Sequence, residues 1–113
     1  MLDLATVRRE QFAVCLDQDF EIIFTDGVLP VKLVEAKRWG PDQPPNIRQP
    51  FTITFRGESN LRLPQSTYKM RNPNLGEMDI FLVQIAADAN SSTFEAVFNT
   101  RRSQRNTKKR TPL

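Results

Sequence analysis

The sequence predicts a mainly β protein: a small antiparallel barrel or sandwich of about six strands with one short N-terminal helix. Several short segments alternate apolar and polar residues, which is the period of a half-buried strand. Turn-forming residues, such as Asp26-Gly27, separate these segments at spacings typical of small β-domains. A helical period is visible only near the N-terminus, over residues 4–16.

The expected helix spans residues 4–16. Thr6 is the candidate N-terminal cap, and Leu4 precedes it as a hydrophobic staple. Phe12 and Leu16 lie four residues apart, so both are expected on the face that packs against the sheet.

The first two strands are expected to form a β-hairpin. Phenylalanine and isoleucine alternate with other residues in 20–24, the Asp26-Gly27 turn follows, and the run 28–39 comes next. Pro30 has no backbone donor, so we expect it at a strand start or edge.

The second half of the chain contains the remaining strands. Residues 40–50 hold four prolines and no periodicity, which predicts an extended loop. Residues 51–56 alternate most clearly, and a strand after residue 65 ends in an Asn-Pro-Asn-Leu-Gly turn. Residues 77–86 are nearly all apolar, so both faces of that strand are expected to be covered, and 93–101 alternate again.

The inward positions of these strands predict the core. Its expected members are Phe20, Ile22, Phe24, Leu33, Phe51, Ile53, Phe55, Ile80, Leu82, Phe94 and Phe98. The sheet is expected to be closed or nearly closed, with the helix packed at an end or over an opening. Symmetric assembly through edge pairing would protect the edges of such a small β-domain.

The length of 113 residues fits one domain, which we expect over residues 1–100. The net charge of +3 hides an asymmetry, because no acidic residue follows Glu95 and the segment 101–113 adds six positive charges. Ten basic and 13 acidic residues remain before it, which gives −3. Residues 101–113 are therefore expected to be a basic, flexible tail.

The residue inventory argues against catalysis. The chain has no histidine, which removes the commonest general base near neutral pH, and a single cysteine, which cannot form the usual zinc site. No phosphate-binding glycine motif is present. We therefore expect a protein that is not an enzyme, with no cofactor, no metal and no small-molecule substrate.

Two groups of carboxylates have alternative interpretations. Asp17, Asp19 and Glu21 alternate and would share a face in an extended chain, where a hard cation could bind, although aspartate is also common at element boundaries. Glu77 and Asp79 similarly form either an acid–base pair or, as we prefer, a solvated strand face.

Four further residues need a choice between packing and function. Cys15 is expected to be buried and inert, because reactivity requires exposure and a lowered pKa. Tyr68 is expected to be packed, with a hydrogen-bonded hydroxyl. Arg38 and Trp39 stand at the start of the proline-rich loop, where they either anchor a partner or cover the end of the barrel.

The basic tail is the strongest local signal. Its cations could bind phosphates of nucleic acid non-specifically, dock on an acidic protein surface or order within an assembly, or only aid solubility. The candidate partner-binding residues are Arg38, Trp39, Arg101, Arg102, Arg105, Lys108, Lys109 and Arg110.

Several motifs resemble a family of uncharacterised bacterial proteins of similar length. They are Phe55-Arg56-Gly57, Leu63-Pro64-Gln65-Ser66-Thr67-Tyr68, Leu75-Gly76, and Phe94-Glu95-Ala96-Val97-Phe98-Asn99. Ser66 stands where the family usually has glycine, and Phe94 where it has tyrosine. The family is associated with fibre proteins of the phage-tail-collar type, and the resemblance therefore implies structural work in a tail-like particle.

Together these observations predict a non-enzymatic structural or adaptor subunit of a phage-tail-like or other multi-protein assembly. The alternative is a small nucleic-acid-associated protein that binds phosphates through its tail. Expected partners are other protein subunits, including copies of itself, with nucleic acid as a further candidate and no membrane. The N-terminus does not have the pattern of a signal peptide, so we expect a cytoplasmic location or one within a virion-like particle.

Overall fold

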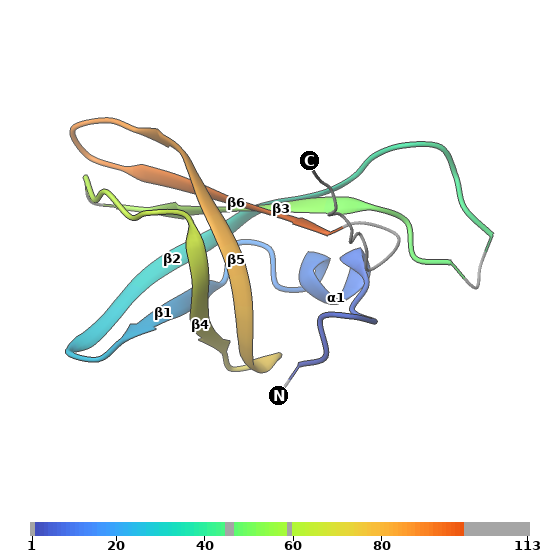
Figure 1. The fold of residues 1–113 in the computed structure, drawn as a ribbon, viewed down its shortest axis with the longest axis horizontal. Helices are drawn as coiled ribbons and strands as arrows, with labels where there is room; N and C mark the ends of the chain where they lie inside the picture. Colours follow the sequence, from blue (N-terminus) through green and yellow to red (C-terminus); the bar gives the residue numbers. More distant parts are fainter. Residues whose placement is uncertain (1, 45–46, 59, 99–113) are drawn as a thin grey trace, which may run out of the picture.

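A computed structural model of the chain describes residues 2–44, 47–58 and 60–98. Its elements, in chain order, are α1 (Arg9–Ala13), β1 (Asp19–Phe24), β2 (Gly27–Arg38), β3 (Phe51–Gly57), β4 (Ser66–Asn72), β5 (Gly76–Ala87) and β6 (Ser92–Phe98). The strands pair antiparallel in the order β1-β2-β3-β6-β5-β4, and β4 returns to β1 (Figure 1). The mainly β fold with one helix is confirmed, and it is a closed barrel.

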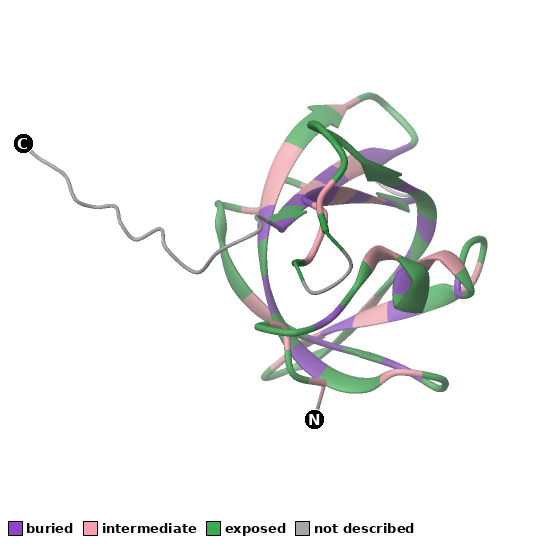
Figure 2. Cartoon of the chain, turned by 90° about the vertical axis from the view of Figure 1, so that its right-hand side faces the viewer, coloured by how far each residue is buried: buried purple, intermediate pink, exposed green. Residues whose placement is uncertain are grey.

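The pleat of each strand decides which side chains fill the barrel. In β3, Phe51, Ile53 and Phe55 are buried, while Thr52 and Thr54 between them are half-buried. Figure 2 shows the same alternation around the barrel, where buried and more exposed segments follow one another along the strands. The buried members of the predicted core are Phe20, Ile22, Leu33, Phe51, Ile53, Phe55, Ile80, Leu82, Phe94 and Phe98.

Phe24 departs from the predicted core because it lies at the last position of β1. It is half-buried, and its ring packs edge-on against the ring of Tyr68, with 6.0 Å between the centroids. The residue therefore covers the barrel at this end and does not fill its centre.

The helix is shorter than predicted. It runs from Arg9 to Ala13, and its N-terminus is closed by the Arg8 backbone N–H, which donates to Gln11 Oε1 at 2.8 Å. Thr6 is not the cap, because the backbone N–H groups of Thr6 and Val7 both donate to the Asp3 carbonyl in a separate turn. Val7 is buried in the core, and the segment that contains it precedes the helix and is not part of it.

Only one of the two predicted helix contacts is present. Phe12 is fully buried, and its ring lies 6.4, 6.0 and 5.6 Å from the rings of Phe20, Phe51 and Phe98. Leu16 is exposed because the helix ends before it and the chain turns toward β1. The helix thus closes one end of the barrel with a single aromatic side chain.

The prediction that both faces of β5 are covered was wrong. Met78, Ile80 and Leu82 point into the barrel and are buried, but Phe81 and Ile85 on the same strand keep about half of their surface exposed. The apolar run of β5 therefore does not indicate a strand that is covered on both faces. A barrel has a single interior, so only one face of each strand is buried in it.

The sheet closes between β1 and β4, as expected of a closed or nearly closed sheet. These two strands pair through Glu21–Arg71, Ile22–Met70 and Ile23–Lys69. Closure reduces the strand edges that are open to pairing with a second copy.

The described residues include no helix long and apolar enough to cross a membrane.

Candidate functional site

Four arginines gather at the end of the barrel that α1 closes. Arg8 and Arg9 belong to the start of α1, Arg38 is the last residue of β2, and Arg48 comes from the loop before β3. They line a pocket of about 440 Å³, which we call the arginine pocket. Its remaining lining residues are Glu10, Asp42, Gln43, Pro44, Ile47 and Gln49. This volume lies within the range of pockets that hold small ligands.

Arg48 is the best-anchored cation of the arginine pocket. Its Nη1 donates to the carbonyl oxygens of Leu4 and Val7 at 2.8 and 2.9 Å. Its guanidinium carbon lies 5.9 Å from the ring centroids of both Phe51 and Phe98, which is within the range of cation–π contacts. Arg48 therefore ties the N-terminal segment and the loop to the aromatic end of the core.

The positive charges in the arginine pocket oppose one another. Burial lowers the pKa of Arg48, and the positive charge of Arg8 lowers it further. Arg9 is held by its Nε, which donates to the Ala36 carbonyl at 2.9 Å, and it lies 3.7 Å from Glu10. An anion placed among these groups would relieve the repulsion between Arg8 and Arg48.

Gln49 fixes the loop that forms one wall of the arginine pocket. Its Nε2 donates to the carbonyls of Trp39 at 2.7 Å and Pro41 at 2.8 Å, while its Oε1 accepts from the Gln43 N–H at 3.2 Å. Gly40, at φ +82°, supplies the left-handed backbone that the turn requires. The described residues of the predicted extended loop thus contain neither helix nor strand, but side-chain hydrogen bonds hold them in place.

A second surface lies on the outside of the barrel. Phe81 and Val97 expose 52% and 54% of their surface, and Trp39 exposes 43%. The Trp39 Nε1 donates to Thr52 Oγ1 at 3.1 Å, and Thr52 is paired with Val97 across β3 and β6. We call Trp39, Val97 and Phe81 the apolar wall.

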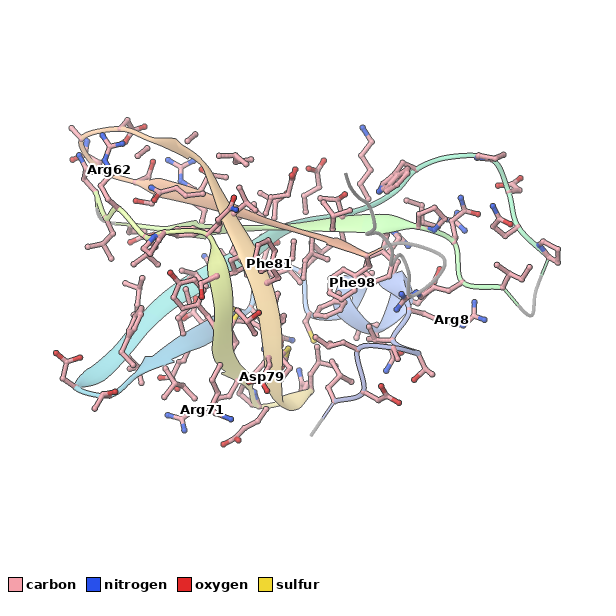
Figure 3. The ribbon with its side chains drawn as sticks, viewed as in Figure 1. Arg8, Arg62, Arg71, Asp79, Phe81 and Phe98 are labelled. Carbon is pink, nitrogen blue, oxygen red and sulfur yellow. The ribbon has the colours of Figure 1, made fainter. Side chains whose placement is uncertain are left out.

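The strand register connects the members of the apolar wall. Val83 of β5 is paired with Glu95 of β6, and both point outward. Phe81 precedes Val83 by two residues and Val97 follows Glu95 by two, so both flank this pair on the outer face. Phe81 lies near the middle of the molecule, away from both ends of the barrel (Figure 3). Ile85, which is 51% exposed, continues the row at the bulge in β5.

The predicted partner-binding residues fall into three places. Arg38 lines the arginine pocket, and Trp39 belongs to the apolar wall. Arg101, Arg102, Arg105, Lys108, Lys109 and Arg110 lie outside the described residues. The sequence analysis missed Arg8, Arg9 and Arg48, because only the closed barrel brings these three arginines together with Arg38.

The carboxylates that alternate in the sequence do not gather around one point. Glu21 Oε1 accepts a hydrogen bond from Arg71 Nε at 2.7 Å, and Asp79 lies 3.7 Å from Lys69. Within residues 2–44, 47–58 and 60–98 no three histidine, cysteine, aspartate or glutamate side chains form a group able to hold a metal ion. Glu21 and Asp79 each pair with a cation on a neighbouring strand.

Cys15 and Tyr68 have the structural surroundings expected of them. Cys15 is fully buried, its thiol donates to Asn72 Oδ1 at 3.8 Å, and burial raises its pKa. Asn72 Oδ1 also accepts from the backbone N–H groups of Asn74 and Leu75, which forms the turn before β5. The Tyr68 hydroxyl donates to the Pro64 carbonyl at 2.6 Å, and burial raises its pKa as well.

Comparison with known protein families assigns the chain to a family. A family model described as a domain of unknown function, DUF6916, matches residues 7–98, which includes every strand of the barrel. The chain belongs to the DUF6916 family. No curated protein and no solved structure matches it. Membership agrees with the resemblance to an uncharacterised family, and the matched range contains both the arginine pocket and the apolar wall of this DUF6916 domain.

Proposed function

We propose that this DUF6916 domain is a non-enzymatic structural or adaptor subunit of a multi-protein assembly, and that it binds other protein chains through the apolar wall. The observation that carries the proposal is the outward exposure of Phe81 and Val97, each by about half, on strands whose inward residues are buried. Single exposed apolar residues are common, but Phe81 and Val97 flank the same Val83–Glu95 pair on the outer face. Trp39 is hydrogen-bonded to Thr52, the residue paired with Val97, and this arrangement favours one shared apolar patch.

The chemistry of the apolar wall fits a protein partner. Trp39 and Phe81 are aromatic, and aromatic side chains are enriched in the cores of protein interfaces. The hydrogen bond from Trp39 to Thr52 holds the indole in one orientation before binding, so less conformational entropy is lost when a partner packs against it. Because the barrel is closed, side chains on its outer face are available for contact with a partner.

The proposed setting is a phage-tail-like particle. Its support is the motif resemblance, since the matching family is described only as a domain of unknown function. Two of the motifs maintain the barrel. Tyr68 bonds back to Pro64, and Phe94 is buried opposite Phe55. These residues support a rigid scaffold, which is what a structural subunit requires.

Light scattering after gel filtration tests the proposal. The purified full chain is expected to form a defined oligomer, and Phe81→Asp is expected to dissociate it to monomers, because a buried, unpaired charge strongly weakens an interface. Val28→Asp is the matched control, since Val28 is also exposed and apolar but lies beside the β1–β2 turn. Circular dichroism of both variants checks that the barrel is intact.

A strictly monomeric protein at its highest soluble concentration would contradict self-assembly. An oligomer that Phe81→Asp and Val28→Asp weaken equally would remove the apolar wall as its interface. Deletion of residues 101–113 in the same experiment shows whether the basic segment takes part in assembly.

The second candidate function is non-specific binding of nucleic acid through the basic segment. Six cations and no acidic residue follow Glu95, and this charge distribution favours contact with phosphates. Deletion of residues 101–113 is expected to abolish binding to arbitrary DNA, and binding to the full chain is expected to weaken steeply with salt. Binding that survives the deletion would contradict this candidate.

A further inference from the structure

We propose that the arginine pocket binds a small tetrahedral oxyanion with two negative charges, of the phosphate class. The site is distinct from the apolar wall, and the inference does not depend on the proposed assembly function. The arginine pocket would hold an inorganic ion or a phosphomonoester, and the proposal concerns binding of this ligand without its chemical conversion.

The charge of the lining supports a dianion. Four arginines and two carboxylates line the pocket, which leaves a formal charge of +2. Glu10 lies 3.7 Å from Arg9 and offsets part of its charge. A single carboxylate would neutralise half of this excess, whereas a phosphate dianion matches all of it.

The type of cation also favours an oxyanion. Arginine presents a planar fork of donors that matches the oxygens of phosphate, and it keeps its charge when partly buried. The site combines arginines from three separate segments, α1, the end of β2 and the loop before β3. A cluster that only served as a solvated surface would not need to enclose a pocket between them.

Hydrogen bonds hold two of the arginines and one wall of the pocket in place. Arg48 is fixed by the Leu4 and Val7 carbonyls, and Arg9 by the Ala36 carbonyl. The hydrogen bonds of Gln49 fix the opposite wall. Cations held in place before the ligand arrives lose little conformational entropy on binding, so the affinity for an anion is correspondingly higher.

An arginine far from the arginine pocket provides a control for the binding experiment. Arg8 lies at the end that carries α1, whereas Arg62 lies at the opposite end (Figure 3). Arg62 is exposed and lines a different surface depression with Leu63 and Ile85. Arg62 therefore provides a control for the effect of removing one positive charge.

The experiment measures binding of inorganic phosphate to the full chain by calorimetry and by thermal shift, at constant ionic strength set with chloride and at about pH 8, where phosphate is mainly a dianion. Wild type is expected to bind saturably. Arg38→Gln is expected to weaken affinity by about tenfold, the loss of one charge-assisted contact, while Arg62→Gln leaves it unchanged. Asp42→Asn, which removes a negative charge from the lining, is expected to tighten binding.

Binding measurements with other anions distinguish the chemical classes of ligand. Sulfate binding with the same dependence on Arg38 supports the tetrahedral dianion, and tighter binding of glycerol phosphate than of inorganic phosphate assigns the ligand to phosphomonoesters. If only citrate or other carboxylates bind, the phosphate class is wrong. Equal weakening by Arg38→Gln and Arg62→Gln, or absence of saturable binding by any of these anions, overturns the site. Arg8→Gln is the second variant, because the Arg8 backbone N–H and carbonyl, which bond to Gln11 at the start of the helix, are kept in this variant.

Discussion

The two ends of the barrel are closed by different interactions. At one end, the Phe12 ring fills the opening and Arg48 lies over Phe51 and Phe98. At the other end, the segment before β4 is held by neutral hydrogen bonds. Gln84 contacts Leu61 and Leu63 in this way. Closure therefore does not require charge, and the concentration of arginines at the helix end calls for an explanation of its own.

The comparison separates stability from binding. The aromatic rings at the helix end and the amide hydrogen bonds at the far end each exclude water from the core, so both serve the fold. Arg38, by contrast, has an exposed side chain that lines the pocket, although its backbone belongs to β2. Substitutions in the closing groups are expected to change stability, whereas substitutions in the pocket rim are expected to change binding.

The largest effect is expected at the helix end. Phe12→Ala removes a fully buried ring that contacts three other rings, and it should cost about 3–5 kcal/mol of unfolding free energy. Urea denaturation measures the change. Val14→Ala is the control, because Val14 follows the helix and is 73% exposed, and it should change stability by less than about 0.5 kcal/mol. Equal effects of the two variants would show that the helix does not close the barrel.

A smaller effect is expected at the far end. Gln84→Ala removes one bond to the Leu63 N–H and one to the Leu61 carbonyl, at 2.8 and 2.6 Å. At roughly 1 kcal/mol for each bond, the loss should be about 2 kcal/mol in urea denaturation. Gln84→Glu keeps an acceptor for Leu63 but loses the donor to Leu61, so an intermediate loss is expected. If Gln84→Ala leaves stability unchanged, the far end is closed without these bonds.

The sequence predicted the barrel strands well because the period of two is a local property. The inward residues of β3 and β6, such as Phe55 and Phe94, could be identified from alternation alone. The helix was predicted too long, because Val7 is packed into the core and leaves the helical path, and this is a tertiary effect. Similarly, the exposure of Phe81 depends on the closure of the barrel, which the apolar run of β5 does not reveal.

The candidate sites were predictable only in part. Trp39 and Arg38 stand out beside the proline-rich loop, but they are adjacent in sequence and still contribute to different surfaces. The doublet Arg8 and Arg9 shows no relation to Arg48 in the sequence, since about forty residues separate them. Their meeting follows from α1 and the loop covering the same end of the barrel. Pairs of distant arginines are therefore found only once the fold is known.

The smallest change in the free energy of unfolding is expected at alkaline pH. It involves one residue toward each end of the barrel. Burial raises the pKa of Cys15 above its ordinary 9.0 and that of Tyr68 above its ordinary 10.0. As pH rises, each group loses its proton first in the unfolded chain, which is thereby favoured. Each group's contribution to the free energy of unfolding should be fully present below its ordinary pKa. The free energy should therefore fall as pH rises above about 9 for Cys15 and above about 10 for Tyr68.

Unfolding free energies measured across this range assign each step to one end of the barrel. Cys15→Ala is expected to remove the loss that begins near pH 9.0, and Tyr68→Phe the loss that begins near pH 10.0. Both variants keep a side chain that fits an apolar site, so the pH dependence and not the absolute stability is the informative quantity. If Cys15→Ala has the same slope as wild type between pH 9.0 and pH 10.0, the thiol is not titrating from a buried position. The helix end would then be open to water around Cys15, and its aromatic closure would be weaker than the packing of Phe12 implies.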